Sequence, residues 1–279
     1  MEILLTQLAA KHPAANPGAP HAIGPMSLHI AAGEQVAVIG PSGAGKTTFL
    51  HAVACALRPS SGQLQLAAQN PWQLSGRALQ ALRGKLFLAP QVPPLPPRQR
   101  VVTAVLAGRL PQMGFVQSLQ SLFYPKEIAL AHQALNAFDL GEKIFERVDR
   151  LSGGERQRVG LARLLASTAQ LWLVDEPLSA LDPTRASQAL EVLTRTAQER
   201  GATLVCTLHQ VERALERFSR IIGLKNGEVA FDLPTHQVTH DVLTALYAQH
   251  AHELFGSAPV NEFPEQRAEP SRPAAMHCR

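Results

Sequence analysis

The segment GPSGAGKTT, residues 40–48, constrains this 279-residue chain more than any other feature. It follows a short apolar run, QVAVI, which is typical of a buried strand in a parallel sheet. Apolar residues then recur at helical spacing from Phe49 to Leu57, where RPSSG ends the pattern. A glycine-rich loop between a strand and a helix predicts an α/β fold that binds an anion at the loop.

The loop matches the phosphate-binding pattern G-x-x-x-x-G-K-[ST] with Gly40, Gly45, Lys46 and Thr47. Glycines let backbone N–H groups turn toward an anion, and the following helix adds about half a positive charge at its N-terminus. We expect Lys46 to bridge the β- and γ-phosphates and the Thr47 hydroxyl to ligate Mg²⁺. The alternative is a chance glycine-rich turn, but the position between strand and helix favours nucleotide binding.

A second apolar run, LWLV at 171–174, ends in the acidic pair Asp175 and Glu176. Ligands of open α/β sheets gather at the carboxyl ends of the strands. We expect Asp175 to hold the Mg²⁺ shell and Glu176 to polarise the attacking water. Adjacent carboxylates repel each other unless a metal or substrate shares their charge. The alternative to a metal site is an acidic pair that is simply solvated at the end of the strand.

The remaining pattern alternates strands with helices. TLVCTL at 203–208 predicts a third buried strand, and a helix is expected over 186–197. The dipeptide Asn226-Gly227 predicts a tight hairpin turn. VPPLPP, after Gln91, predicts a linker without regular structure, leading into a helical insertion that spans about 92–166. Scattered prolines predict a disordered tail over 256–279.

The segment LSGGERQRV, residues 151–159, is more specific than the two elements above. Ser152 and Glu155 have the spacing of a capping box that opens a helix. The paired glycines again free backbone N–H groups for an anion. The local pattern of this segment, taken alone, favours a well-capped helix that binds nothing.

Composition excludes several classes of protein. The net charge is +4, without a long run of Lys and Arg, so nucleic acid is not an expected partner. Three separated cysteines fit a reducing compartment and show no metal-ligand spacing. No stretch reaches the roughly 18 apolar residues of a membrane span, and no leader is evident. We therefore expect a cytosolic chain that reaches a membrane only through a partner.

LSGGERQRV resembles the signature sequence of the ATP-binding-cassette family. Other matches follow in the family's order: Gln91 resembles its glutamine loop, SALD at 179–182 its D-loop, and His209 its switch histidine. The resemblance implies a P-loop NTPase (RecA-like) core with a parallel sheet, an N-terminal antiparallel β subdomain and an inserted α-helical subdomain. Together these would form one nucleotide-binding domain over 1–255.

The resemblance also implies a site shared by two copies of the chain, paired head to tail around ATP and Mg²⁺. Ser152, Gly153 and Gly154 of one copy would contact the γ-phosphate held by the other. The expected catalytic residues are Glu176, His209 and Lys46, and the expected metal ligands are Thr47, Gln91 and Asp175. The expected ATP-binding residues are Gly40, Pro41, Ser42, Gly43, Ala44, Gly45, Lys46, Thr47, Thr48, Gln91, Ser152, Gly153, Gly154 and Asp182.

By the same resemblance, ATP hydrolysis would drive a membrane-embedded permease that contacts the helical insertion, at the cytoplasmic face of the inner membrane. VLAGRLPQMGFVQSLQSLFYPKE, TLHQV, FDLP and Leu246-Tyr247-Ala248 are similar to segments of phosphonate-import ATP-binding subunits. An importer for phosphonate or a related oxyanion, served by a periplasmic solute-binding protein, is therefore expected. Importers of phosphite, phosphate or another organic anion are the close alternative.

Other functions fit the sequence less well. Cassette ATPases of DNA repair or translation tend to carry tandem cassettes or a long coiled coil, and neither is evident here. A small-molecule kinase is disfavoured by LSGGERQRV. A pairing module that binds ATP without hydrolysing it is disfavoured because Glu176 and His209 are both present.

Two departures from the family pattern affect the expectations. No Phe, Tyr or Trp occurs between Lys11 and Gly33, where an aromatic residue usually stacks on adenine. His12 or His21 would stack only weakly, so we expect loose selection of the base. The prolines after Gln91 replace the usual polar and aliphatic residues and are expected to stiffen the insertion.

Overall fold

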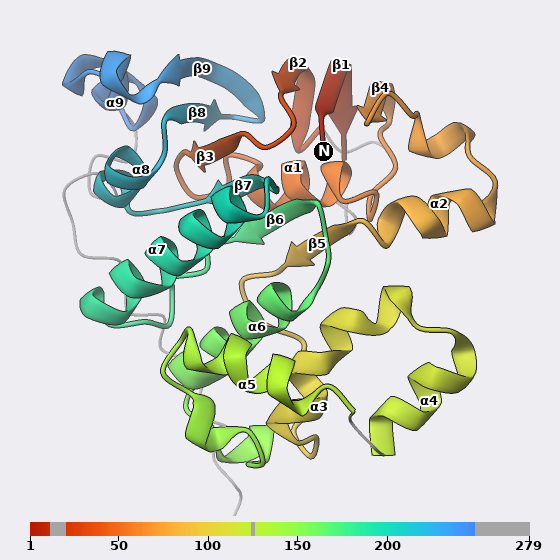
Figure 1. The fold of residues 1–279 in the computed structure, drawn as a ribbon. Helices are drawn as coiled ribbons and strands as arrows, with labels where there is room; N and C mark the ends of the chain where they lie inside the picture. Colours follow the sequence, from red (N-terminus) through yellow and green to blue (C-terminus); the bar gives the residue numbers. More distant parts are fainter. Residues whose placement is uncertain (12–20, 124–125, 249–279) are drawn as a thin grey trace, which may run out of the picture.

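The computed structural model describes residues 1–11, 21–123 and 126–248, which form two sheets and a group of helices (Figure 1). One sheet has the strand order β2-β1-β4 and is antiparallel. The other has the order β5-β6-β7-β3-β8-β9, in which only β9 runs antiparallel to its neighbour. The strands are β1 (Ile3–Ala10), β2 (Ile23–Ile30), β3 (Gln35–Ile39), β4 (Ser61–Leu66), β5 (Leu86–Ala89), β6 (Leu171–Asp175), β7 (Thr203–Thr207), β8 (Arg220–Lys225) and β9 (Glu228–Pro234).

The α-helices are α1 (Lys46–Val53), α2 (Gly76–Arg83), α3 (Val101–Leu106), α4 (Phe115–Phe123), α5 (Ile128–Asn136), α6 (Gly153–Ala166), α7 (Pro183–Glu199), α8 (Val211–Arg217) and α9 (His240–Leu246). Short 3₁₀ helices lie at η1 (Pro71–Gln73), η2 (Ala107–Gln112), η3 (Gly141–Lys143), η4 (Val148–Arg150) and η5 (Thr235–Gln237). The predicted α/β core with a parallel sheet, the antiparallel sheet and the inserted helices are confirmed.

The three apolar runs form the centre of the larger sheet. β3, β6 and β7 are buried almost throughout because helices and the second sheet cover both faces. Thr207 at the end of β7 pairs with both Val38 of β3 and Asp175 of β6. The carboxyl ends of the three strands are therefore level, which brings the loops that follow them to one edge of the sheet.

Alternate residues of these strands face two separate hydrophobic clusters. On β6, Leu171 and Leu173 pack in the cluster that contains α1 and the antiparallel sheet. Trp172 and Val174 pack in the cluster that contains α3, α5, α6 and α7. Successive side chains of a strand point to opposite faces, so α1 and α6 lie on opposite faces of the larger sheet.

Helix α1 is shorter than the sequence pattern predicts. The helical periodicity predicts that the helix continues to Leu57, but α1 ends at Val53. Cys55 has φ +55°, a left-handed conformation that ends a helix. The apolar residues that follow Val53 are still buried, since Ala54 and Cys55 belong to the core.

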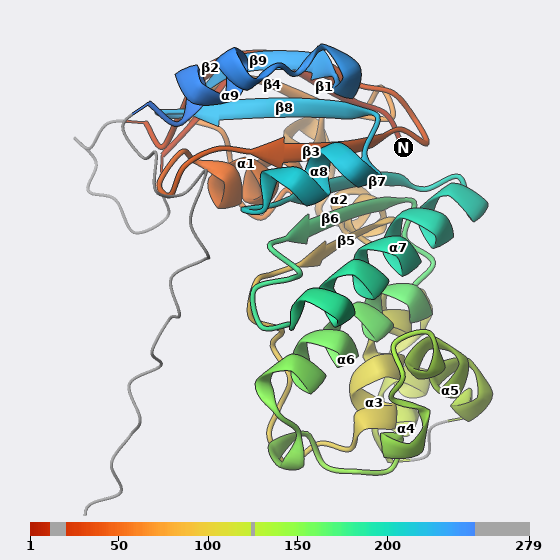
Figure 2. The ribbon, with the colours of Figure 1, turned by 90° about the vertical axis from the view of Figure 1, so that its left-hand side faces the viewer.

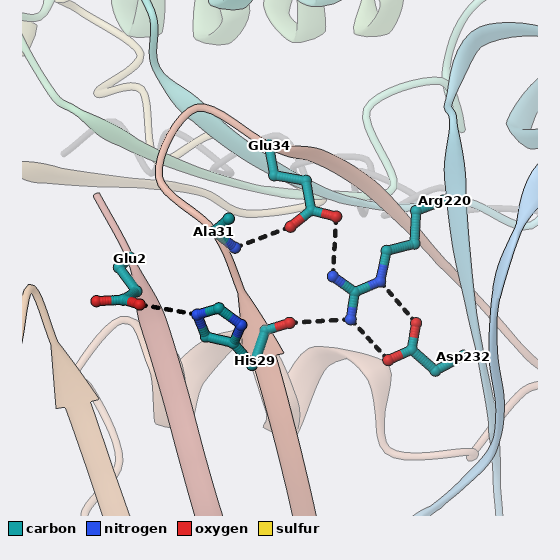
Figure 3. Close-up of polar contacts among 6 residues, drawn as sticks. All are labelled: Glu2, His29, Ala31, Glu34, Arg220 and Asp232. Carbon is teal, nitrogen blue, oxygen red and sulfur yellow. Dashed lines mark hydrogen bonds and ion pairs between the residues drawn. The ribbon is translucent and has the colours of Figure 1, made fainter.

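An ion-pair network joins the two sheets at Arg220 of β8 (Figure 3). Arg220 Nε and Nη2 donate to Asp232 of β9 at 2.7 and 2.6 Å, and Nη1 donates to Glu34 at 2.8 Å. Nη2 also donates to the carbonyl of His29 on β2 at 2.9 Å. The hydrogen bond to Asp232, followed by the one to Glu34, raises the pKa of Arg220 above its ordinary value. The network links β2 to β8 and β9 of the larger sheet by charge-assisted hydrogen bonds.

Helices α3, α4, α5 and α6 group at the end of the molecule away from the antiparallel sheet (Figure 2). Residues 92–99 have no helix or strand, as the prolines predict. The boundaries of the insertion at 92–166 and of the domain at 1–255 remain predictions, and the tail over 256–279 lies outside the described residues. Among the described helices, none is long and apolar enough to cross a membrane.

Candidate functional site

The phosphate loop requires glycine at two positions. Gly45 has φ +97°, and a Cβ there would lie 2.6 Å from the carbonyl oxygen of Ala22. A Cβ on Gly40 would lie 2.1 Å from the carbonyl oxygen of Leu224. Gly43 also has positive φ, +78°, but nothing lies within 4 Å of a Cβ placed there. The loop is therefore packed tightly at its two ends and open in its middle.

The hairpin turn of β8 and β9 supports this loop. Asn226 and Gly227 both have positive φ, as the predicted Asn-Gly turn requires. The Gly227 N–H donates to the carbonyl of Ala44 at 3.1 Å, and its own carbonyl accepts from Gly24 at 2.7 Å. The hairpin itself is predicted by the sequence, whereas its contact with the phosphate loop depends on tertiary structure.

Three predicted catalytic side chains come together. Glu176 Oε1 lies 2.7 Å from His209 Nε2 and 3.9 Å from Lys46 Nζ. Lys46 is buried and donates to the carbonyls of Gly40 and Pro41 at 2.7 and 3.2 Å. Glu176 has φ +45°, an uncommon conformation for a residue with a side chain, of the kind that clusters at functional sites. One carboxylate oxygen therefore faces both a lysine and a histidine.

A threonine that the sequence does not single out for this role fixes the acidic pair. Thr207 is fully buried, and its hydroxyl donates to Asp175 Oδ1 at 2.6 Å and accepts from the Glu176 N–H at 2.9 Å. The sequence indicates Thr207 as part of the predicted strand 203–208 and of the TLHQV resemblance, with no role at the site. Thr207 has this role because it pairs with Asp175 on the neighbouring parallel strand.

The signature segment forms the predicted capping box at the start of α6. The Glu155 N–H donates to Ser152 Oγ at 3.2 Å, and the Ser152 N–H donates to Glu155 Oε2 at 2.8 Å. A Cβ on Gly154 would lie 2.8 Å from the carbonyl oxygen of Ala180, so α6 packs closely on the SALD segment. Nothing lies within 4 Å of a Cβ on Gly153.

Two further predicted residues lie on loops at the strand ends. Asp182 caps α7 by accepting from the Arg185 N–H at 3.0 Å, a bond that lowers its pKa. Gln91 is exposed on the loop that follows β5. The roles of Asp182 and Gln91 in binding nucleotide or metal stay predictions.

The proline segment after Gln91 packs against the approach to the signature. Carbonyls of Pro97 and Gln99 accept from Asp149 and Val148, at 2.9 and 3.0 Å. Gly160 of α6 leaves room for Pro93 at a position where a Cβ would lie 2.6 Å from the ring. Pro93 therefore packs on α6, and the backbone at 97–99 is hydrogen-bonded to η4.

The region expected to hold the base is partly described. His21 is exposed, and its Nδ1 lies 3.1 Å from Ser60 Oγ. His12 lies outside the described residues. Among the described residues of this region, no aromatic ring of Phe, Tyr or Trp is available, as the sequence shows.

The fold and the loop arrangement define an ATP-binding cassette, and comparison with known proteins supports this class. The family model described as "ABC transporter" matches residues 23–179. The chain belongs to the ABC transporter family, as its signature segment predicted.

Two full-length relatives are more specific. The chain is 64% identical to "Phosphonates import ATP-binding protein PhnC 2" of Albidiferax ferrireducens, over all of both chains. It is 65% identical to "Phosphonates import ATP-binding protein PhnC" of a Polaromonas species, again over all of both chains. The predicted resemblance to phosphonate-import ATP-binding subunits is confirmed.

A solved structure gives the same fold. It is described as a dimeric, post-hydrolysis state of the ATP-binding cassette MJ0796 bound to ADP and Pi. That protein is 27% identical to this chain, with a TM-score of 0.73 over 84% of this chain and 98% of its own.

Proposed function

We propose that this chain is the ATP-hydrolysing subunit of an importer for phosphonates or a related small oxyanion. The observation that carries the proposal is the full-length identity of 64% and 65% to two proteins named as phosphonates import ATP-binding proteins. Importers of phosphite, phosphate or another organic anion remain the second candidate, because the transported solute would not touch this subunit.

The phosphate loop and the Glu176 cluster supply the residues for hydrolysis. Backbone N–H groups of 40–48 and the Lys46 ammonium would hold the phosphates. Glu176 would accept the hydrogen bond of the attacking water and orient it toward the γ-phosphorus. His209, already on the same carboxylate oxygen, would donate to the charge that develops on the γ-phosphate.

The donor set also fits Mg²⁺. Asp175 is 4% exposed, and a carboxylate buried to that degree requires a partner for its charge. The Thr47 hydroxyl, Asp175 and Gln91 are hard oxygen donors of the type that Mg²⁺ prefers. When bound, Mg²⁺ neutralises charge on the β- and γ-phosphate oxygens.

The signature residues would act on the nucleotide of a second copy. α1 and α6 lie on opposite faces of the larger sheet, so the signature residues and the phosphate loop of one chain open helices on different faces. A two-fold head-to-tail pair would bring these residues to the partner's γ-phosphate. The MJ0796 cassette, which is described as dimeric, supports the pairing of two copies.

The helical end of the molecule would contact the permease at the cytoplasmic face of the inner membrane. Val92, next to Gln91, is 71% exposed, and Val116 and Leu119 of α4 are 65% and 53% exposed. A contiguous patch of such exposed apolar side chains would mark a protein contact. A periplasmic solute-binding protein would deliver the solute to the permease.

Growth on a phosphonate tests the proposal. A strain without this chain should fail to grow on methylphosphonate as sole phosphorus source and grow normally on phosphate. The wild-type gene should restore growth, and a Glu176→Gln copy should not. Normal growth of the deletion strain on methylphosphonate, with loss on phosphite or phosphate, would favour the second candidate.

A further inference from the structure

A lysine outside the family motifs holds the signature segment. Lys143 ends the 3₁₀ helix η3, and its Nζ lies 2.5 Å from Glu155 Oε1 in the first turn of α6. Both side chains are partly buried, with 25% and 18% of their surfaces exposed. A charge-assisted hydrogen bond in such a setting is stronger than one between neutral groups.

The contact continues to the signature serine. Glu155 uses its other oxygen, Oε2, to accept from the Ser152 N–H at 2.8 Å. Ser152 Oγ in turn accepts from the Glu155 N–H at 3.2 Å. Lys143 therefore anchors a carboxylate that directly fixes the backbone of Ser152.

The scaffold that presents Lys143 is itself held in place. The Lys143 N–H donates to the carbonyl of Leu140 at 3.0 Å, and its carbonyl accepts from Glu146 at 2.9 Å. Arg158 of α6 is buried and donates to the carbonyl of Phe138 at 2.6 Å. The segment before the signature is thus attached to α6 at two points, one of which is the lysine.

Charge explains why a lysine suits this position. The hydrogen bond from Lys143, followed by the one from the Ser152 N–H, lowers the pKa of Glu155 to about 2. An ionised carboxylate has acceptors only. Glu155 therefore keeps both hydrogen bonds at neutral pH, with its two oxygens directed to different partners.

We propose that Lys143 is a positioning residue for the signature: through Glu155 it fixes Ser152 in the conformation presented to the partner's nucleotide. This inference rests on the proposed function, in which the signature acts across a dimer. It names a residue outside every predicted site and assigns it an effect on the partner copy rather than on its own phosphate loop.

The test is Lys143→Ala in the full chain. Because the signature acts in trans, dilute subunits should bind ATP with a Kd within about twofold of wild type. When Lys143→Ala is combined with Glu176→Gln, the Kd of the ATP-dependent dimer should rise about tenfold. When Glu176 is kept, Lys143→Ala should lower kcat about tenfold. Lys143→Arg keeps the charge and should retain more than half of the wild-type dimer affinity and of the wild-type kcat.

Two controls separate positioning from loss of charge or fold. Lys85 is exposed on a different part of the molecule, so Lys85→Ala removes the same charge and should leave kcat unchanged. In a Glu155→Gln background, Lys143→Ala should change kcat less than twofold, because the neutral amide no longer needs the lysine. Circular dichroism would confirm that each variant is folded.

Two results would overturn the inference. One is a Lys143→Ala chain with the dimer affinity and kcat of Lys85→Ala. The other is an equal loss from Lys143→Ala in the wild-type chain and in the Glu155→Gln background. If Ser152→Trp, which should block the interface, leaves hydrolysis unchanged, the proposed dimer site fails instead.

Discussion

Two glycine-rich helix starts, at α1 and at α6, differ in how their N–H groups are satisfied. The start of α1 has no side-chain cap and no acidic residue in its first turn, and its N-cap, Gly45, is left-handed. The start of α6 has a complete capping box, with Glu155 in the first turn. The first helix has no side-chain cap at its start, which suits the proposed anion site, whereas the second is capped by its own Ser152 and Glu155.

This difference indicates two kinds of site. The phosphate loop is the proposed binding site within one chain. The hairpin supports it through Gly227, and Glu176 lies next to its lysine. The signature is a shaped surface, held by Lys143 and packed on Ala180. Substitutions on the α1 side should therefore change nucleotide binding or chemistry in single subunits, and those on the α6 side should act through the dimer.

The largest effect is expected for Glu176→Gln. A neutral amide cannot stabilise the positive charge that develops on the attacking water. The activation barrier should therefore rise by about 3–4 kcal/mol, and kcat should fall several hundredfold. ATP binding should remain, and the closed dimer should accumulate on a sizing column. Near-normal turnover would remove Glu176 from its proposed role.

Gly45→Ala should nearly abolish nucleotide binding. The added Cβ would lie 2.6 Å from the Ala22 carbonyl oxygen, and residue 45 is left-handed. The clash and the backbone strain together should weaken the binding free energy of ATP by about 2–3 kcal/mol. Gly43→Ala is the matched control, because it shares the positive φ but not the clash, and should cost about 1–2 kcal/mol. Equal losses in ATP titrations of the two variants would contradict the packing argument.

Gly154→Ala should act on the dimer instead. The Cβ must displace the Ala180 carbonyl, so kcat should fall about tenfold while dilute subunits bind ATP normally. Gly153→Ala has open space and should retain the melting temperature of wild type, even where it weakens the dimer. A fall in the ATP affinity of dilute Gly154→Ala would show that α6 also shapes its own phosphate loop.

Acid should weaken the α6 side through Glu155. Its pKa is about 2 in the folded chain and about 4.5 in the unfolded chain, so its stabilising effect is present above pH 4.5. That effect is lost as the pH falls from about 4.5 to 2. Denaturant melts of Lys143→Ala should show a smaller loss over this window than wild type does; an identical loss would contradict the pairing.

The smallest effect concerns the base. Without an aromatic residue between Lys11 and Gly33, ATP, GTP and CTP should bind with affinities within about threefold of one another. Competition titrations with a fluorescent ATP analogue would measure this. A strong preference for ATP would instead assign the base to a contact outside the described residues.

Local pattern was sufficient where one segment carries its own physics. The buried strands β3, β6 and β7, the Asn226-Gly227 turn and the Ser152–Glu155 box all follow from composition and spacing, and all are confirmed. The predicted end of α1 was wrong because a single left-handed residue, Cys55, stopped the helix inside an apolar run. The strands of the antiparallel sheet were expected from family resemblance alone, since no periodicity had indicated them.

The sequence by itself determined the phosphate loop, the acidic pair and the family, because these depend on residues that are neighbours in the chain. Tertiary structure decided which distant groups meet. Thr207 contacts Asp175 through strand pairing, Gly227 contacts Ala44 through a hairpin folded back on the loop, and Lys143 contacts Glu155 through helix packing. Spacing along a chain carries no information on such contacts, since strand order and packing set them.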